Sequence, residues 1–105
     1  MYHFHVYFAL NNVAAAEELH QKIRQTQADK IERIYPLVER LVGPHKMPMF
    51  EIHVADINNG FADWLDAQRG DLSVLMHPVT GNDLKDHTEG AAWLGRELGV
   101  FEEKL

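Results

Sequence analysis

The sequence contains no cysteine, which excludes disulfides, thiolate metal ligands and a thiol nucleophile. Any bound metal would therefore be held by histidine, aspartate, glutamate or water. No apolar run approaches the roughly 20 residues of a membrane-spanning helix, so we expect no membrane partner. Ten basic residues stand against 16 acidic ones, the net charge is −6, and no basic cluster occurs, which argues against a nucleic-acid partner.

The chain also lacks internal repeats, low-complexity stretches and linkers. Its 105 residues are 46% hydrophobic and 25% charged, which predicts one globular domain over residues 1–105. The chain opens on a strand-like pattern rather than a signal-peptide layout, so we expect a cytoplasmic protein. Histidine, in contrast, is abundant, with seven copies, and the positions of these side chains guide the interpretation of function.

Residues 2–8 alternate apolar and polar side chains with period two, which predicts a β-strand. Its two faces would be Phe4, Val6 and Phe8 on one side and His3, His5 and Tyr7 on the other. The two imidazoles would stand ~6–7 Å apart at ~3.3 Å of rise per residue, close enough to reach one metal ion or one substrate. A half-exposed strand that merely carries two histidines gives the same pattern, so this strand alone leaves both interpretations open.

Helical spacing of apolar residues favours an amphipathic helix from Val13 to about Arg33, which Pro36 would end at the latest. The other expected elements are strands at Leu37–Val42, Met47–Val54 and Asp71–His77, a short helix at Phe61–Arg69, a helix from Leu84 to about Leu98, and a loose tail at Phe101–Leu105. The first two of these strands would form a hairpin. The order β-α-β-β-α-β, with an extra C-terminal helix, is the ferredoxin-like α+β pattern.

In a ferredoxin-like sheet the first strand lies between the third and the fourth and runs antiparallel to both. The start of the first strand then meets the ends of the other two. We expect this to gather five polar side chains at one end of one face: His3, His5, Glu51, His53 and His77. The rest of that face would form a pocket floor from Tyr7, Met47, Met49, Ser73 and Leu75. A floor this apolar predicts closure by the C-terminal helix or by a second subunit, and a homodimer.

Imidazoles with a carboxylate and no sulfur suit Zn(II) or non-haem Fe(II), and two histidines with one carboxylate is the arrangement of Fe(II) oxygenases. A polar, partly solvated sheet face would carry the same residues without a metal. Two further functions stay open: a non-catalytic ferredoxin-like dimer that binds a metal or a small aromatic molecule, and a cofactor-free isomerase or monooxygenase that uses histidine as acid and base.

Three segments carry more specific motifs: His3–Phe8, Gly43–Glu51 and Leu72–Gly81, the last followed by Asp86–Glu89 and Ala92–Gly95. The most specific part is His-Pro-Val-Thr-Gly at 77–81, followed by Asp-His-Thr-Glu at 86–89. With these motifs, which span nearly the whole chain, the sequence resembles the DOPA 4,5-dioxygenase family of extradiol ring-cleaving enzymes and their bacterial relatives. The long first helix carries little of the likeness.

The resemblance implies a ferredoxin-like, usually dimeric protein that opens a catechol such as DOPA with Fe(II) and O2. The family's histidine motif carries over to His3, His5, His45, His77 and His87. We expect metal ligation by His3, His5 and His77, with Fe(II) as the cofactor and Zn(II) as a substitute in purified samples. His53 and Lys46 depart from the family pattern, which tends to have an apolar residue and a proline there.

Ring opening also needs a proton acceptor outside the metal set, and we expect His87 first and His45 second in this role. His87 would lie on the inward stripe of the C-terminal helix with Leu84 and Ala91. His45 would reach the pocket only if its loop folds over it or if the partner subunit supplies it. Residues expected to line the pocket or to support the ligands are Tyr7, Met49, Glu51, His53, Ser73 and Asp86.

Overall fold

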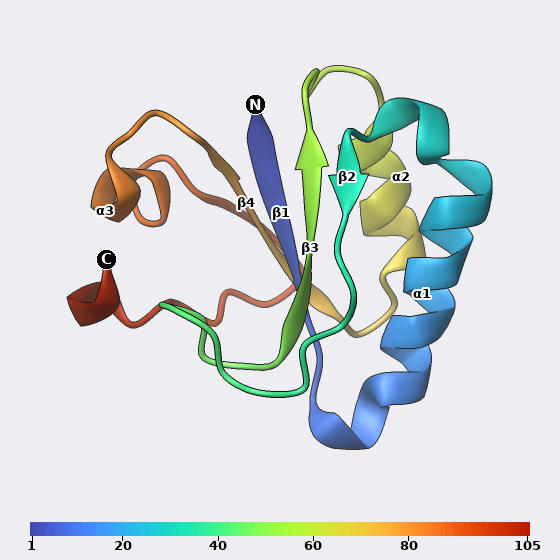
Figure 1. The fold of residues 1–105 in the computed structure, drawn as a ribbon, viewed down its shortest axis with the longest axis horizontal. Helices are drawn as coiled ribbons and strands as arrows, with labels where there is room; N and C mark the ends of the chain where they lie inside the picture. Colours follow the sequence, from blue (N-terminus) through green and yellow to red (C-terminus); the bar gives the residue numbers. More distant parts are fainter.

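A computed structural model describes residues 1–105 and shows a five-stranded antiparallel sheet with other elements packed on both faces (Figure 1). The strands are β1 (Tyr2–Tyr7), β2 (Arg33–Ile34), β3 (Met49–Val54), β4 (Ser73–Pro78) and β5 (Ala92–Leu94). The helices are α1 (Val13–Thr26), α2 (Phe61–Gln68) and α3 (Asp83–Asp86). The spatial order β2-β3-β1-β4-β5 confirms the predicted α+β class and the central place of the first strand.

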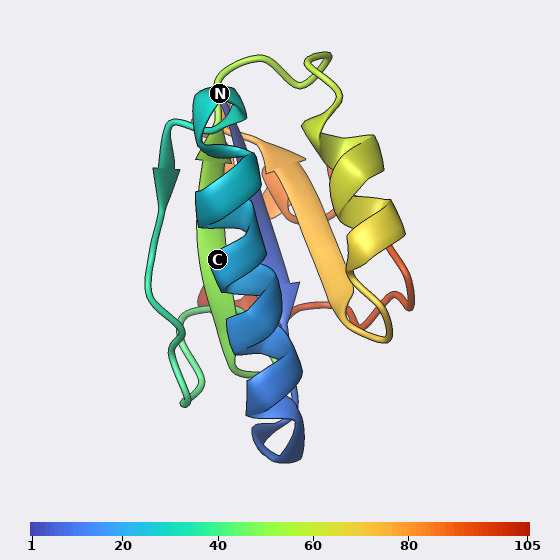
Figure 2. The ribbon, with the colours of Figure 1, turned by 90° about the vertical axis from the view of Figure 1, so that its right-hand side faces the viewer.

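The helices α1 and α2 cover one face of the sheet (Figure 2). Period-two alternation in β1, β3 and β4 turns every second side chain toward them, as the sequence predicted. The buried core of this layer consists of Phe4, Val6, Phe8, Ala16, Leu19, Ile23, Phe50, Ile52, Val54, Phe61, Leu65, Leu72 and Val74. Burial of each large apolar side chain contributes roughly 1.5–3 kcal/mol, so this layer holds the sheet rigid beneath its second face.

The strand register places polar residues together on the second face. His3 lies opposite His53 on β3 and opposite His77 on β4, and His5 lies opposite Glu51. The predicted meeting of the start of the first strand with the ends of its two neighbours is therefore confirmed. All of these side chains belong to the alternate set that faces away from α1 and α2.

The first helix is shorter than its sequence pattern indicated, and its predicted end near Arg33 is wrong. α1 ends at Thr26, and a 3₁₀ turn follows at Ala28–Lys30. The chain then runs along the edge of β3, where the Glu32 amide donates to the His53 carbonyl at 2.8 Å. Pairing here satisfies backbone groups that a longer helix would have left free on β3, so tertiary pairing overrides helix propensity.

The strand predicted at Leu37–Val42 is also wrong. The edge strand β2 lies earlier in the chain, and from the predicted stretch only Val38 forms a bridge, with Met49. β3 starts after Pro48, because proline has no N–H to give to a ladder. A long connection, residues 35–48, therefore replaces the predicted hairpin.

The helix predicted from Leu84 to Leu98, and with it the extra C-terminal helix, is wrong as well. α3 ends at Asp86, and the chain turns at Gly90, whose amide donates to the Lys85 carbonyl at 2.8 Å. β5 then pairs along the edge of β4 and covers it. Gly95, at a φ of 78°, is in the left-handed region and ends this strand rather than continuing a helix.

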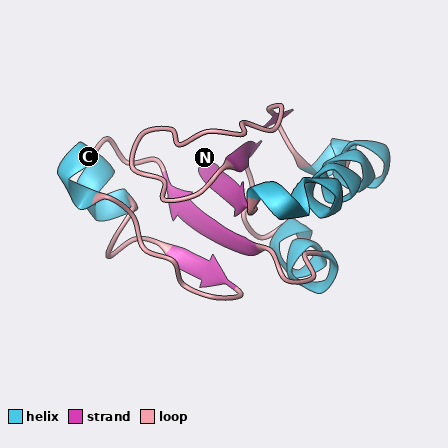
Figure 3. Ribbon diagram, turned by 90° about the horizontal axis from the view of Figure 1, so that it is seen from below, coloured by secondary structure: helices cyan, strands magenta, loops and turns pink.

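The last residues cover the second face of the sheet, opposite α1 and α2 (Figure 3). The apolar cluster there consists of Tyr7, Met49, Leu75 and Val100, with Val42, Met47, Ala91, Trp93, Leu98 and Leu105 packed against it. The tail is not loose as predicted, because it forms a 3₁₀ turn at Glu102–Lys104 and the Phe101 amide donates to the Pro44 carbonyl at 2.7 Å. The chain's own C-terminal segment, residues 95–105, thus closes the face for which we expected a helix or a second subunit.

Candidate metal and catalytic site

Five histidines meet at the end of the second face, beside the apolar cluster. They come from β1, from the connection 35–48, from β4 and from the residue after α3: His3, His5, His45, His77 and His87. Ring centroids lie 4.0 Å apart for His77 and His87, 4.2 Å for His5 and His45, and 5.1 Å for His5 and His77. The structure therefore brings together every histidine expected as a ligand or as a base; we call this group the histidine cluster.

The shortest contact in the histidine cluster joins His5 and His77, whose Nε2 atoms are 3.0 Å apart. Nδ1 of His77 donates to the Pro78 carbonyl at 2.8 Å, and because a neutral imidazole has one N–H, its Nε2 presents a lone pair. Nδ1 of His5 is buried without a hydrogen bond, and Glu51 Oε1 lies 3.4 Å away. Two arrangements fit these distances. In one, the Nε2 atoms of His5 and His77 share a proton. In the other, the proton of His5 lies on Nδ1, toward Glu51, and both Nε2 atoms direct their lone pairs at one ion.

His45 reaches the cluster within its own chain, because the connection 35–48 folds over the second face. Its backbone forms a bridge with Val100, and its side chain is buried. Its Nδ1 lies 2.7 Å from the hydroxyl of Tyr7, a floor residue that the sequence placed on the same face. Of the two routes expected for His45, the structure shows the loop folding over the pocket.

His87 joins the cluster directly after α3. Its inward position is confirmed, but the predicted helical stripe is not, because the neighbouring Leu84 is 49% exposed. The short helix instead orients His87 so that its Nδ1 donates to the Asp83 carbonyl at 2.8 Å. As in His77, this hydrogen bond leaves the lone pair of the neutral ring on Nε2.

Glu51, His53 and His3 form the rim of the cluster. Glu51 Oε2 accepts a hydrogen bond from His53 Nε2 at 2.6 Å, and the rings of His3 and His53 stack with centroids 3.7 Å apart and planes 5° from parallel. One ligand atom from each of the three lies within 4.8 Å of the others. Lone pairs of parallel rings lie in parallel planes, however, and do not converge on an ion ~2.1 Å from both. This trio alone therefore does not form a metal site, although His3 remains available to a metal shared with His5 and His77.

Burial favours the neutral form of His5, His45 and His77. Desolvation, followed by the charges of His45 and His77, holds the pKa of His5 well below its usual value. Burial lowers the pKa of His45 to about 4, with smaller effects from His87 and His77. Burial also lowers the pKa of His3 and of His77. Neutral imidazole is the form that binds a metal ion or accepts a proton.

Two overlapping triplets offer nitrogens within 4.8 Å of one another: His3, His5 and His77, and His5, His45 and His87. The first is the set that the sequence predicted as ligands. Neutral, sulfur-free imidazoles are donors that Fe(II) and Zn(II) accept. The buried Nδ1 of His5 beside Glu51 also fits a histidine that ligates through Nε2. The residues present therefore fit a divalent metal.

Three of the residues expected around the pocket have other contacts. Asp86 accepts hydrogen bonds from the Thr80 amide at 2.8 Å and from the Thr80 hydroxyl at 2.5 Å, and these bonds lower the pKa of its carboxyl. Its hydrogen bonds go to Thr80 rather than to a histidine. Ser73 lies opposite Tyr7, at the end of β4 far from His77, and Met49 packs within the apolar cluster.

Sequence reasoning missed two contacts that shape the site, the hydrogen bonds of Tyr7 with His45 and of Thr80 with Asp86. Each joins residues whose proximity depends on how a loop folds, and period-two or helical patterns carry no such information. The threonine and the aspartate do stand at fixed positions in the most specific motif, which was the available signal. The tyrosine stands two residues after His5, on the same face, so its nearness to the cluster followed from the strand pattern.

A pocket of about 510 Å³ opens beside the histidine cluster, with His87 in its wall. Its lining consists of Lys46, His87, Thr88, Glu89, Trp93, Glu97, Gly99, Val100 and Glu102. Trp93 adds an aromatic surface and stacks near Tyr7 at a centroid distance of 5.8 Å. The pocket therefore combines an aromatic wall with direct access to the imidazole of His87.

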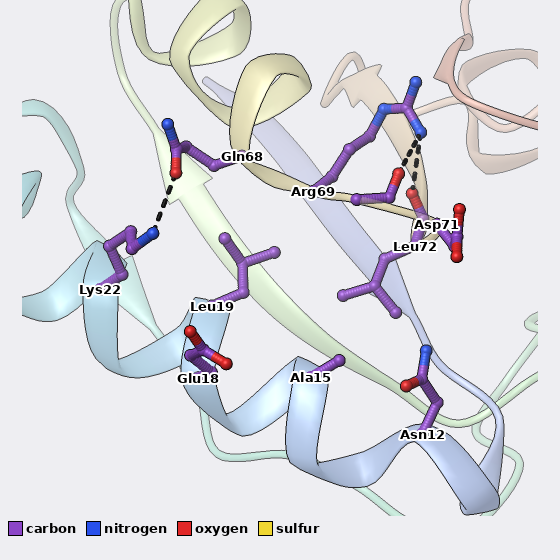
Figure 4. Close-up of a pocket in the computed structure, with 10 residues that line it drawn as sticks. Asn12, Ala15, Glu18, Leu19, Lys22, Gln68, Arg69, Asp71 and Leu72 are labelled. Carbon is purple, nitrogen blue, oxygen red and sulfur yellow. Dashed lines mark hydrogen bonds between the residues drawn. The ribbon is translucent and has the colours of Figure 1, made fainter.

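A second hollow, of about 300 Å³, lies on the opposite side of the sheet between α1 and the turn after α2 (Figure 4). Lys22 donates to Gln68 across it at 3.0 Å, and Arg69 donates to the Gly70 and Leu72 carbonyls. No histidine lines this hollow. It is therefore separate from the candidate site.

A ferredoxin-like antiparallel sheet that ends in a cluster of histidines defines a small α+β protein with an imidazole site suited to a metal. The profile of the Dopa 4,5-dioxygenase family matches residues 2–103, and the chain belongs to this family, as the motifs predicted. A DOPA 4,5-dioxygenase from Amanita muscaria is 36% identical over 101 residues, which cover 90% of this chain and 44% of that protein. An uncharacterized 21.2 kDa protein from Botryotinia fuckeliana is 36% identical over 106 residues, covering 90% and 57%.

The fold is shared with the crystal structure of a candidate dioxygenase from Nostoc punctiforme. The TM-score is 0.75 at 28% identity, and the match covers 97% of this chain and 87% of that one. The chain spans about half the length of the two fungal relatives. None of its helices combines the length and the apolar character needed to cross a membrane.

Proposed function

We propose that the protein is an extradiol-type dioxygenase that opens the ring of a catechol, such as DOPA, with non-haem Fe(II) and O2. The observation that carries this proposal is the His5–His77 pair, whose Nε2 atoms face each other at 3.0 Å while their Nδ1 atoms lie near acceptors. The name of the relative from Amanita muscaria and the name of the family support the reaction class.

The pocket beside His87 supports a small aromatic substrate. Its volume of about 510 Å³ lies within the roughly 300–1,000 Å³ of small-molecule sites, and Trp93 gives it an aromatic wall. His87 lines this pocket, and its ring centroid lies 4.0 Å from that of His77. A catechol bound against Trp93 would thus present its hydroxyl groups to the imidazoles.

His3, His5 and His77 would hold the iron. When bound, Fe(II) supplies the Lewis acidity that lowers the pKa of the catechol hydroxyls and a common site for catechol and O2. The protein holds these ligands neutral by burial and orients His77 through the Pro78 carbonyl. Nε2 of His87, whose Nδ1–H is fixed by Asp83, would accept the second catechol proton. The C-terminal segment would exclude water from this end of the sheet.

Oxygen uptake by the purified chain against a panel of small catechols tests this function. After anaerobic loading with Fe(II), we expect uptake with at least one catechol, loss of uptake after chelation, and recovery when Fe(II) is returned. His87→Gln should retain iron and lose at least ~100-fold in turnover. Iron-loaded protein without uptake on any catechol would favour a binding module, and turnover indifferent to chelators would favour cofactor-free chemistry.

A further inference from the structure

The hydroxyl of Tyr7 forms a hydrogen bond with His45, a histidine of the cluster. Its oxygen lies 2.7 Å from Nδ1 of His45, and its side chain is 2% exposed. A tyrosine hydroxyl is ordinarily protonated at neutral pH, so it has a proton to donate. His45 is its one hydrogen-bond partner in the structure, and a buried hydroxyl donates to an available acceptor rather than leave its proton unbonded. Nδ1 of His45 therefore accepts the bond.

The opposite arrangement holds for His77 and His87, whose Nδ1 atoms lie 2.8 Å from the carbonyl oxygens of Pro78 and Asp83. A carbonyl oxygen only accepts, so Nδ1 carries the proton in both rings and Nε2 carries the lone pair. In neutral His45 the one ring proton must lie on Nε2. The rings of His45 and His77 are 6.1 Å and 4.0 Å from the ring of His87, so one small site contains both tautomers.

We propose that Tyr7 is a positioning residue that fixes His45 as the hydrogen-bond donor of the site. With its proton on Nε2, His45 donates to a substrate oxygen that gains negative charge during ring opening, and it serves neither as ligand nor as base. Proton acceptance then belongs to His87, whose Nε2 has a free lone pair. The donor role rests on the proposed function, whereas the tautomer of His45 does not.

Long-range ¹H–¹⁵N imidazole spectra of the full, metal-free chain test the tautomers directly. We expect Nε2–H for His45 and Nδ1–H for His77 and His87. Tyr7→Phe removes one oxygen and keeps the ring in the apolar cluster, and it should move the His45 proton toward Nδ1. The matched control Tyr2→Phe makes the same change on the helix-facing side of β1 and should leave the spectra unchanged. An Nδ1–H His45 in the wild type, or an unchanged tautomer in Tyr7→Phe, overturns the proposal.

Kinetics of the iron-loaded chain test the donor role. Tyr7→Phe should lower kcat ~10–100-fold with KM and bound iron unchanged. His45→Gln, whose amide N–H reaches about as far as Nε2–H, should retain more turnover than His45→Ala. An unchanged kcat in Tyr7→Phe with a shifted tautomer overturns the donor role. If the wild type opens no catechol, the proposed function fails and the donor role with it, while the spectra still decide what Tyr7 does to His45.

Discussion

The hydrogen-bond partner of Nδ1 decides which nitrogen carries the proton in His45, His77 and His87. Backbone carbonyls hold the protons of His77 and His87, Glu51 lies behind His5, and Tyr7 lies behind His45. Partners of this kind fix ring orientation and ligand basicity, and their loss typically costs roughly 10–100-fold in metal affinity or activity. The chemistry of the cluster therefore depends on main-chain positions as much as on the number of histidines.

Removal of one buried ligand, His77, should abolish metal binding and leave the fold in place. We expect His77→Ala to lose bound iron, and to lower the free energy of unfolding by about 1–3 kcal/mol, because it removes a buried, hydrogen-bonded ring. Metal analysis after anaerobic loading and urea unfolding measure the two effects. His20→Ala is the control, since His20 bonds the Tyr35 carbonyl outside the cluster. Full iron occupancy in His77→Ala would show that His77 is not a ligand.

Burial of neutral histidines should make the metal-free protein sensitive to mild acid. The pKa of His45 falls from 6.5 to about 4 on folding. Between these two pH values the unfolded chain therefore binds a proton at His45 and the folded chain does not. Stability from this residue is present above pH 6.5 and is lost as the pH falls toward 4. Between pH 7 and pH 5 the loss is about 2 kcal/mol for His45 alone. The lowered pKa values of His3, His5 and His77 act in the same direction.

Urea unfolding of chelator-treated protein at several pH values checks this dependence. His45→Gln removes the titrating ring and should flatten part of the slope. An unfolding free energy that stays constant between pH 7 and pH 5 would contradict the burial of neutral imidazoles.

Among the secondary-structure elements, the central strands were predictable from the sequence. Strict period two at residues 2–8, 49–54 and 72–77 fixes which side chains face the helices, because a one-residue shift would expose the whole apolar set. The antiparallel order then places His3 beside His53 and His77. This part of the site follows from local patterns and a known topology.

The elements outside the central strands were not predictable in the same way. Residues 28–42 and 84–98 have helix formers or β-branched residues, yet their structure is set by pairing with the free edges of β3 and β4. Edge pairing is a tertiary effect that local propensity does not contain. For the same reason the place of His45 in the site rested on a family motif, and that of His87 rested on a helical stripe that the chain does not form. Their hydrogen bonds to Tyr7 and Asp83 appear only in the folded chain.

The hydrogen bonds between Thr80 and Asp86 should hold α3, and hence His87, in place. Asp86→Ala removes both acceptors of the Thr80 amide and hydroxyl, so we expect faster amide hydrogen exchange at residues 80–88 and lower turnover. Asp83→Ala is the matched control, because the Asp83 side chain has no hydrogen bond while its carbonyl still accepts from His87. Unchanged exchange in Asp86→Ala would show that the loop keeps its shape without these bonds.

For the whole molecule, the homodimer expected from the sequence stays a prediction, and its first argument no longer holds. The apolar floor is covered by the C-terminal segment rather than exposed. Exposed apolar side chains do remain near the histidine end of the sheet, at Val79 and Leu84, each 49% exposed. We expect sedimentation at micromolar concentration to give twice the chain mass of 12.1 kDa, and Leu84→Glu to weaken the dimer. A wild-type mass of 12.1 kDa would contradict this.

The most direct test of the molecule as a dioxygenase is the fate of the two oxygen atoms. Iron-loaded protein is incubated under ¹⁸O-labelled O2 with a catechol that supports oxygen uptake, and the mass of the product is measured by mass spectrometry. We predict a ring-opened product with the mass of the catechol plus one O2 molecule, with both labelled atoms incorporated. A ring-closed product with one labelled atom would indicate a monooxygenase, and a product without label would show that the histidine cluster does not cleave the ring with O2.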